Sequence, residues 1–134
     1  MGRTPPARVA ITPDAADLVR RLVEQHGPLL FHQSGGCCDG SSPMCFPREE
    51  FRVGEREVYL GDVAETPFYM GPEQYEYWSH THLTVDVVPG RGGGFSLEAP
   101  GGVRFLIRSR LFTDDELPAL PAVAVGPHHD RAPD

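Results

Sequence analysis

Three cysteines and one histidine lie close together in the first third of the chain, where they could bind a metal ion. Cys37, Cys38 and Cys45 fall within a stretch of nine residues, and His32 comes five residues before the first of them. Thiolates and imidazoles are ligands that zinc and iron favour in proteins, and four of them complete a tetrahedral shell. The cluster therefore predicts a site for a transition metal (Zn or Fe).

Not every member of this cluster can bind equally well. Adjacent side chains rarely reach one ion together, so we expect Cys37 and Cys45 to be the first-choice ligands. Cys38 is then the third candidate. A histidine would complete the shell, either His32 or His82, which ends a His-Thr-His run later in the chain. In extended backbone the two histidines of such a run project to the same face.

Small and polar residues surround the cysteines and predict a tightly turned loop. Gly35, Gly36 and Gly40 can adopt backbone angles that other residues avoid, so we expect them to shape the binding loop. Asp39 can accept backbone N–H bonds or act as a weak ligand. These four residues complete the predicted cofactor-binding site.

Two other interpretations of the cysteines stay open. In a thiol-redox protein, Cys45 would resolve a sulfur at Cys37 or Cys38, and the N–H groups of Gly35 and Gly36 would lower a thiolate pKa. The chain has no Cys-x-x-Cys motif, which makes this reading weaker than metal binding. Alternatively, the cysteines are small buried residues with a structural role, since free cysteine is often buried.

Motifs of conventional enzymes are missing from the sequence. It contains no Gly-x-Ser-x-Gly elbow, no phosphate-binding loop and no dinucleotide-binding fingerprint. The acidic pairs Glu49-Glu50 and Asp114-Asp115 are typical of solvated surfaces rather than of an acid/base pair. We therefore predict no catalytic residues and expect a binding protein rather than an enzyme.

Length and charge limit the possible partners. A chain of 134 residues with 15 Gly and 14 Pro fits one loop-rich domain, mostly of β structure. The net charge is −7 and the arginines are interspersed with Asp and Glu, so we expect no binding to nucleic acid. No apolar run is long enough for a bilayer and no signal peptide is evident, so we expect a cytoplasmic protein without membrane contact.

The clearest predicted element is a helix that begins after Thr12 and stops at Gly27. Thr12 can cap the exposed N–H groups, Pro13 suits the first helical position, and Gly27 favours termination. Apolar residues between them recur at the spacing of one helical face. This helix should support the fold by packing against a sheet.

Short strands should make up most of the remaining structure, with one or two helical turns over residues 72–78. The predicted strands are Leu29–His32, Phe51–Val53, Glu57–Leu60, Thr66–Met70, Leu83–Val88, Phe95–Leu97 and Val103–Arg108. We expect a hairpin across Gly54–Arg56 and a mainly β (α+β) domain over residues 1–117. Residues 118–134 are rich in Pro and Ala and should form a mobile tail. Exposed strand edges in small β domains often pair, so we expect a homodimer.

The chain resembles the HesB-like, A-type iron–sulfur carrier proteins over roughly residues 8–110. The resemblance lies in the Thr-Pro-x-Ala-Ala start of the helix at residues 12–16 and in Gly35-Gly36-Cys37, and it continues weakly through Gly94–Pro100. It implies a HesB-like fold, with short strands in a sandwich or half-barrel and one N-terminal helix, and it implies that Cys37 is a cluster ligand. The stretch that corresponds to the family's C-terminal Cys-Gly-Cys, Arg104–Arg110, contains no cysteine.

A closer resemblance is to an uncharacterised bacterial family that shares the blocks FHQSGGCCDGSSPMC, here Phe31–Cys45, and VVPGRGG, here Val87–Gly93. Genes of that family are found beside aldehyde or alcohol dehydrogenase genes, which implies an accessory role for such an enzyme. The alternative that this resemblance implies is a binding or chaperone module for the dehydrogenase without a metal. Its contact surface would then use the aromatic residues between Phe68 and Trp78.

Overall fold

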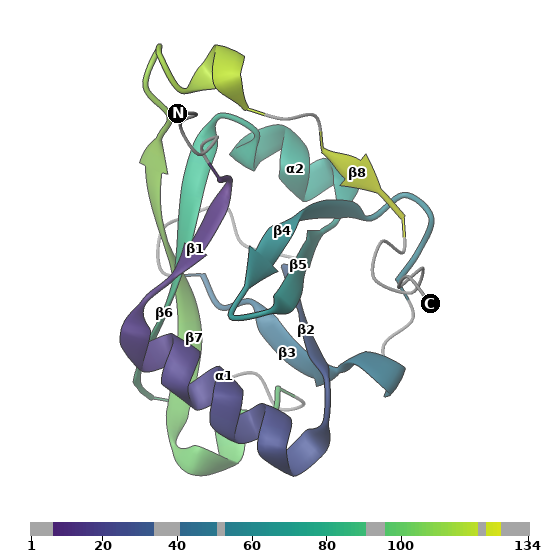
Figure 1. Ribbon diagram of the computed structural model, residues 1–134, viewed down its shortest axis with the longest axis vertical. Coiled ribbons are helices and arrows are strands. Elements are labelled where there is room, and N and C mark those ends of the chain that lie inside the picture. The colour runs from purple at the N-terminus through teal and green to yellow at the C-terminus, as the bar shows by residue number, and fades with distance from the viewer. Residues whose placement is uncertain (1–6, 34–40, 51–52, 91–95, 121–122, 127–134) are drawn as a thin grey trace, which may run out of the picture.

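The computed structural model describes residues 7–33, 41–50, 53–90, 96–120 and 123–126. Over these residues the fold is mainly β, with two α-helices and two sheets, as predicted (Figure 1). The elements are β1 (Val9–Ile11), α1 (Pro13–His26), β2 (Leu29–Gln33), β3 (Met44–Pro47), β4 (Val58–Val63), β5 (Thr66–Met70), α2 (Pro72–Trp78), β6 (Thr81–Pro89), β7 (Val103–Leu111) and β8 (Ala124–Val125). Short 3-10 turns cover Arg48–Glu50, Ala99–Gly101 (η2) and Leu117–Ala119. Neither described α-helix is long and apolar enough to cross a membrane.

The strands form a three-stranded sheet, in the order β1-β6-β7, and a five-stranded sheet, in the order β3-β2-β5-β4-β8. In the first, β6 and β7 make a long antiparallel pair and β1 joins β6 in parallel. In the second, β2 and β5 are parallel and the other pairs are antiparallel. The sheets approach each other at β1 and β4, where a Cβ on Gly61 would lie 3.2 Å from Val9 Cγ2. Gly61 has a φ of +140° beside a bulge in β4, so both its backbone and its lack of a side chain are needed there.

Helix α1 follows the sequence prediction and packs on the core between the sheets (Figure 1). The Thr12 hydroxyl accepts a hydrogen bond from Ala15 N at 3.2 Å and donates one to Asp86 Oδ1 at 2.9 Å. The Thr12 N–H also donates to the Val85 carbonyl at 2.9 Å. The capping residue therefore both starts the helix and attaches it to β6. The helix ends at Gly27, whose φ of +82° favours glycine.

Three of the strand predictions need correction. The predicted hairpin across residues 54–56 is wrong, because Val53 is not in a strand, and residues 51 and 52 lie outside the described residues. The observed hairpin joins β4 to β5, with Ala64 and Glu65 in the left-handed region at φ 49° and 63°. This turn was missed because it carries no glycine. Ser96 is also outside any strand, since residues 96–98 turn to place Glu98 in the interior. Finally, Ala124–Val125 pairs with β4, a strand that the Pro/Ala-rich sequence did not predict.

The main core fills the space between the two sheets and is organised around Phe31. The Phe31 ring meets Phe105 edge-on, with ring centroids 4.9 Å apart, and stacks near Phe68 at 6.0 Å. Successive residues of a strand face opposite sides of its sheet. Leu30, next to Phe31, accordingly belongs to a second, smaller apolar cluster with Tyr69 and Val53. The five-stranded sheet is therefore buried on both faces around β2.

Candidate functional site

The second face of the five-stranded sheet carries a histidine–carboxylate pair. His32 is the next-to-last residue of β2, and its side chain lies on the face opposite Phe31, paired in register with Met44 and Tyr69. Its Nε2 is hydrogen-bonded to Oε1 of Glu57, the residue just before β4. His32 is 8% exposed, so this polar contact is largely enclosed.

Backbone contacts hold Glu57 at this place. The Glu57 N–H donates to the Gly54 carbonyl at 3.3 Å, and its carbonyl accepts from Gly126 N at 2.8 Å. The second contact comes from the residue after β8. The C-terminal segment thus helps to fix the carboxylate that reaches His32.

Tyr69 pairs in register with His32, and Tyr59 pairs with Tyr69, so both rings lie on the same face of the sheet as this histidine. The rings of Tyr59 and Tyr69 lie 5.7 Å apart, and Tyr69 is fully buried. The Tyr59 hydroxyl donates to Asp62 Oδ1 at 2.7 Å. Burial, together with this hydrogen bond and the Asp62 charge, raises the pKa of Tyr59, so the phenol is neutral at physiological pH.

Cys45 faces the other side of the same sheet. It pairs in register with Phe31, belongs to the main core and is fully buried. Burial, and secondarily the Glu98 carboxylate, raises its pKa, so the thiol carries its proton. Its N–H donates to Ser96 Oγ at 2.9 Å and its carbonyl accepts from Leu97 N at 3.0 Å. These features are typical of a structural cysteine.

His82 lies on the other sheet, in β6, opposite Arg110 of β7. Its ring meets Phe112 edge-on at 5.9 Å. Partial burial and the Arg110 charge lower its pKa, and the Glu116 carboxylate only partly offsets them. The imidazole is therefore neutral at physiological pH.

The structure thus separates the three predicted ligands that it describes. His32 lies on one face of the five-stranded sheet, Cys45 on the opposite face, and His82 in the three-stranded sheet. Within the described ranges, no group of three or more His, Cys, Asp and Glu side chains is arranged to hold a metal ion. The His32–Glu57 pair does bring two such groups together, an imidazole nitrogen and a carboxylate oxygen.

The remaining predicted residues, Gly35, Gly36, Cys37, Cys38, Asp39 and Gly40, lie outside the described residues. The chain on either side of them is well attached. Gln33 ends β2 in the five-stranded sheet, and its carbonyl accepts from Gly71 N at 3.4 Å. The Ser41 carbonyl accepts from Ile107 N of β7 at 2.8 Å, and Ser42 Oγ accepts from Arg104 at 2.7 Å. Gln33 is thus attached to the five-stranded sheet, and Ser41 is attached to β7 of the three-stranded sheet.

Sequence reasoning missed Glu57 and Glu98. Glu57 was expected to begin a strand, and no local motif distinguishes it from the neighbouring Glu55. Glu98 is 2% exposed and accepts hydrogen bonds from Ser96 Oγ and, at 3.1 Å, from Phe105 N. Glu57 meets a histidine 25 residues away along the chain, and Glu98 accepts from the backbone of β7 seven residues later, and no spacing rule in the sequence signals either contact.

A comparison with protein families identifies the family of the chain. A model described as a domain of unknown function, DUF779, matches residues 18–111, which is more than half of the chain. The chain belongs to this family. A search of curated proteins found no match. The part of this DUF779 protein that the model matches runs from α1 to the end of β7, and it includes both His32 and Glu57. The expected relationship to an uncharacterised family is thereby confirmed.

Proposed function

We propose that this protein is a small metal-binding accessory protein that holds a zinc or iron ion, or an iron–sulfur cluster, at the His32–Glu57 pair. The observation that carries the proposal is the enclosed contact between His32 Nε2 and the Glu57 carboxylate. An imidazole nitrogen and a carboxylate oxygen that meet at one point can both bind an ion placed between them, each at about 2.0–2.2 Å.

The sequence that follows β2 can supply the remaining ligands. Cys37 comes five residues after His32, and its thiolate would be the third ligand, with Cys38 as the alternative at that position. A mixed shell of nitrogen, oxygen and sulfur favours a single zinc or iron ion over an iron–sulfur cluster, whose usual ligands are thiolates. The HesB-like resemblance instead favours the cluster, with Cys37 as one ligand.

Metal analysis after anaerobic purification tests the proposal. We expect bound zinc or iron, and we expect Co²⁺ substitution to give the intense charge-transfer absorption of a thiolate–cobalt bond. Metal affinity should fall by about 10-fold or more in each of three variants, His32→Ala, Glu57→Gln and Cys37→Ser. Metal affinity should also fall as the pH is lowered, because protons compete for the imidazole and thiolate ligands.

Two matched variants act as controls. His82→Gln removes a histidine from the other sheet, and Cys45→Ala removes a thiol from the main core, so neither should change the metal content. A protein that binds neither metal nor cluster would contradict the proposal. So would retention of the metal in His32→Ala together with its loss in His82→Gln.

A second candidate function is a binding or chaperone module for an aldehyde or alcohol dehydrogenase. Exposed apolar side chains support it: Tyr77 of α2 is 73% exposed and Leu111 at the end of β7 is 75% exposed. Phe68, Tyr69 and Trp78, by contrast, are buried. If this function is correct, a purified dehydrogenase from the same operon should bind the wild type and bind Tyr77→Ser more weakly. Equal binding of both proteins, or of neither, would count against it.

The thiol-redox alternative makes a different prediction. Cys45 is buried and protonated, so it should react slowly with iodoacetamide at neutral pH. Fast labelling of Cys37 or Cys38 in the metal-free protein would indicate an activated thiolate and would favour the thiol-redox alternative. The proposal also includes action in the cytoplasm and assembly as a homodimer. Light scattering of the purified protein tests the homodimer.

A further inference from the structure

The C-terminal strand β8 lies beside the carboxylate residue of the proposed metal site. Glu57 comes just before β4, and the paired residues of β4 and β5 begin one position later, with Val58 opposite Met70. On the other edge of β4, β8 pairs with Val58 and Tyr59, and the Gly126 N–H donates to the Glu57 carbonyl at 2.8 Å (Figure 1). The backbone of Glu57 is therefore attached to the sheet through β8.

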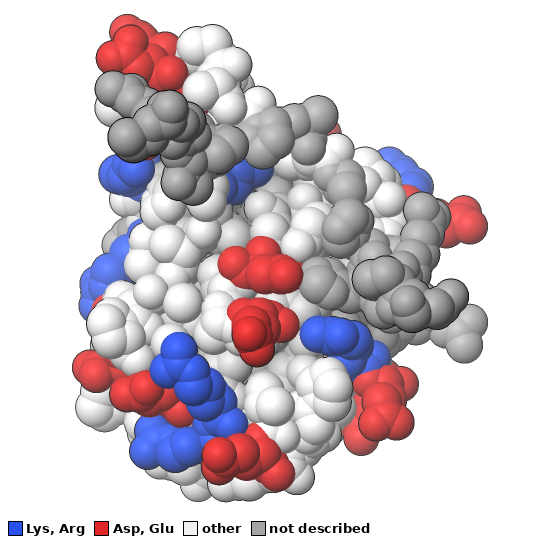
Figure 2. Space-filling view, in the orientation of Figure 1, with Lys and Arg blue, Asp and Glu red and all other residues white. Residues whose placement is uncertain are grey.

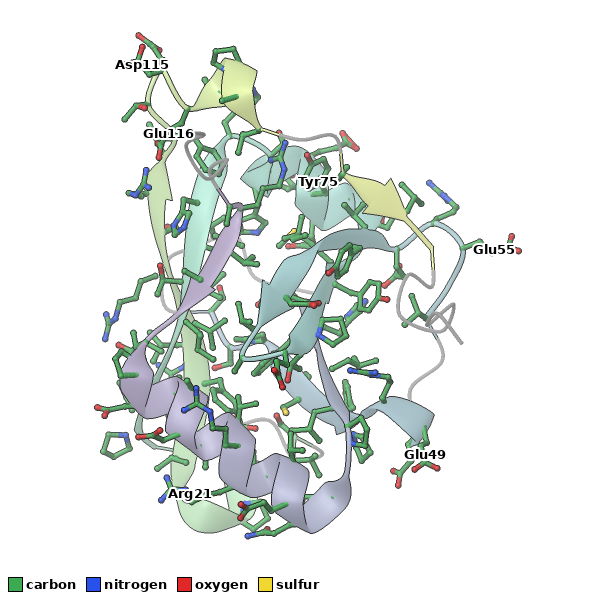
Figure 3. All side chains as sticks on the ribbon, viewed as in Figure 1. Arg21, Glu49, Glu55, Tyr75, Asp115 and Glu116 are labelled. Atoms are coloured by element: carbon green, nitrogen blue, oxygen red, sulfur yellow. The ribbon has the colours of Figure 1, made fainter. Side chains whose placement is uncertain are left out.

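Gly126 fits closely against the turn that precedes Glu57. Its φ is +90°, which favours glycine, and a Cβ placed on it would lie 3.3 Å from the Glu55 carbonyl oxygen. Glu55 and Arg56 of this turn are exposed, and charged side chains of both signs lie at this edge of the molecule (Figure 2). The Glu55 side chain points away from the molecule (Figure 3). The turn thus meets Gly126 through its backbone, and this contact depends on a glycine at residue 126.

The strand β8 is short and only lightly packed. It has two residues, and Val125 is 57% exposed. Val123, just before the strand, is partly buried against the main core. Segments with few buried contacts open at a much lower free energy than the whole domain. We therefore expect β8 to leave β4 while the rest of the fold persists.

We propose that β8 regulates the metal site, so that docking of β8 on β4 and metal binding at the His32–Glu57 pair strengthen each other. This inference rests on the proposed metal site. With β8 docked, the Glu57 backbone is fixed and its carboxylate faces His32. With β8 released, the carboxylate loses this restraint, and a ligand that is poorly held binds the ion more weakly. Coupling is reciprocal, so the metal must strengthen the docking of β8 by the same factor.

Substitution of Gly126 tests one direction of this coupling. We would measure the zinc affinity of the whole chain by competition with a chelator, or the Fe²⁺ affinity if the purified protein holds iron. Gly126→Ala introduces an unfavourable φ and a close contact with the Glu55 carbonyl, so the affinity should fall by about fivefold or more. Gly126→Val should lower it further, because β-branched residues tolerate a positive φ least.

Gly102→Ala is the matched control. Gly102 also has a positive φ, of +75°, and a Cβ there would meet no described atom within 4 Å. It lies in the turn that leads into β7 of the other sheet. The substitution carries the same kind of backbone penalty without touching β8, so the metal affinity should stay unchanged.

Amide hydrogen exchange in the unsubstituted protein tests the other direction. The metal should slow exchange of the Gly126 N–H by about fivefold or more. The Gly90 N–H, which donates to the Gly102 carbonyl at 3.0 Å, also lies at the end of a strand and should exchange at an unchanged rate. This measurement does not depend on the folding of any variant.

Three results would overturn the inference. These are an equal metal affinity of Gly126→Ala and the wild type, an equally large loss in Gly102→Ala, and a Gly126 N–H whose exchange the metal does not slow. In each case the protein still binds metal, so the metal site itself would stand. A wild type that binds neither zinc nor iron would contradict the metal site, and the inference would fail with it.

Discussion

Replacing Glu98 by alanine should destabilise the protein through two buried donors that lose their acceptor. The carboxylate accepts hydrogen bonds from Ser96 Oγ and from Phe105 N, and the residue is 2% exposed. Leaving a buried donor without a partner costs about 1–3 kcal/mol. Two such donors would cost about 2–6 kcal/mol, reduced where water enters from the cavity between α1 and η2 or where the removal of a buried charge is favourable. We therefore expect Glu98→Ala to lower the free energy of unfolding by about 2–4 kcal/mol.

Urea unfolding measures this change, and two further variants separate its causes. Glu98→Gln keeps the shape and one carbonyl acceptor, so it should cost about half as much. Arg20→Ala removes an exposed ion pair with Asp17, and it should change the free energy of unfolding by less than about 1 kcal/mol. The removal of the Glu98 charge should also lower the pKa of Cys45 from its raised value. A free energy of unfolding for Glu98→Ala within about 0.5 kcal/mol of the wild type would refute the reasoning.

Three other substitutions test separate parts of the fold. The hydrogen bond from Arg108 is the main cause that lowers the pKa of Asp86. The ionised carboxylate therefore stabilises the fold above the unfolded-state pKa, and this contribution is lost as the pH falls through the folded-state pKa. In urea unfolding across the acidic range, the free energy of unfolding of Asp86→Asn should decline less with falling pH than that of the wild type. Glu65→Gly relieves a left-handed residue in the β4–β5 turn and should raise the free energy of unfolding by up to about 1 kcal/mol, and a lower Tm would contradict this. Phe31→Ala should cost about 3–5 kcal/mol in the same urea assay, and a loss below about 1 kcal/mol would show that its ring contacts add little.

The elements whose signals are local were predicted well. Helix α1 begins after Thr12 and ends before Gly27 as expected, because a capping residue and a terminating glycine act within one turn of the helix. The β4–β5 turn was missed for the opposite reason. Ala64 and Glu65 adopt positive φ angles because the two strands that they join are held by the sheet, and no turn-forming residue marks the position. The pairing of β8 with β4 likewise depends on a neighbouring strand edge.

The candidate site likewise has one residue that the sequence predicted and one that it did not. The sequence identified His32 as a potential ligand, but it could not supply Glu57, which is 25 residues away along the chain. It also grouped His32 with Cys45, because they are close in the sequence. In the sheet, Cys45 pairs with Phe31 rather than with His32, and adjacent residues of a strand face opposite sides. A shift of one residue in register decides whether two side chains can meet.

By itself, the sequence determined the mainly β class, the N-terminal helix and the set of residue types that could bind a metal. These follow from composition, capping and hydrophobic spacing, which act over a few neighbouring residues. Only the tertiary structure decided that His32 meets Glu57, that Cys45 is enclosed in the core and that Glu98 is buried beside a cavity. The physical reason is that each of these outcomes depends on strand register and on packing between sheets, where the partners come from separate segments of the chain.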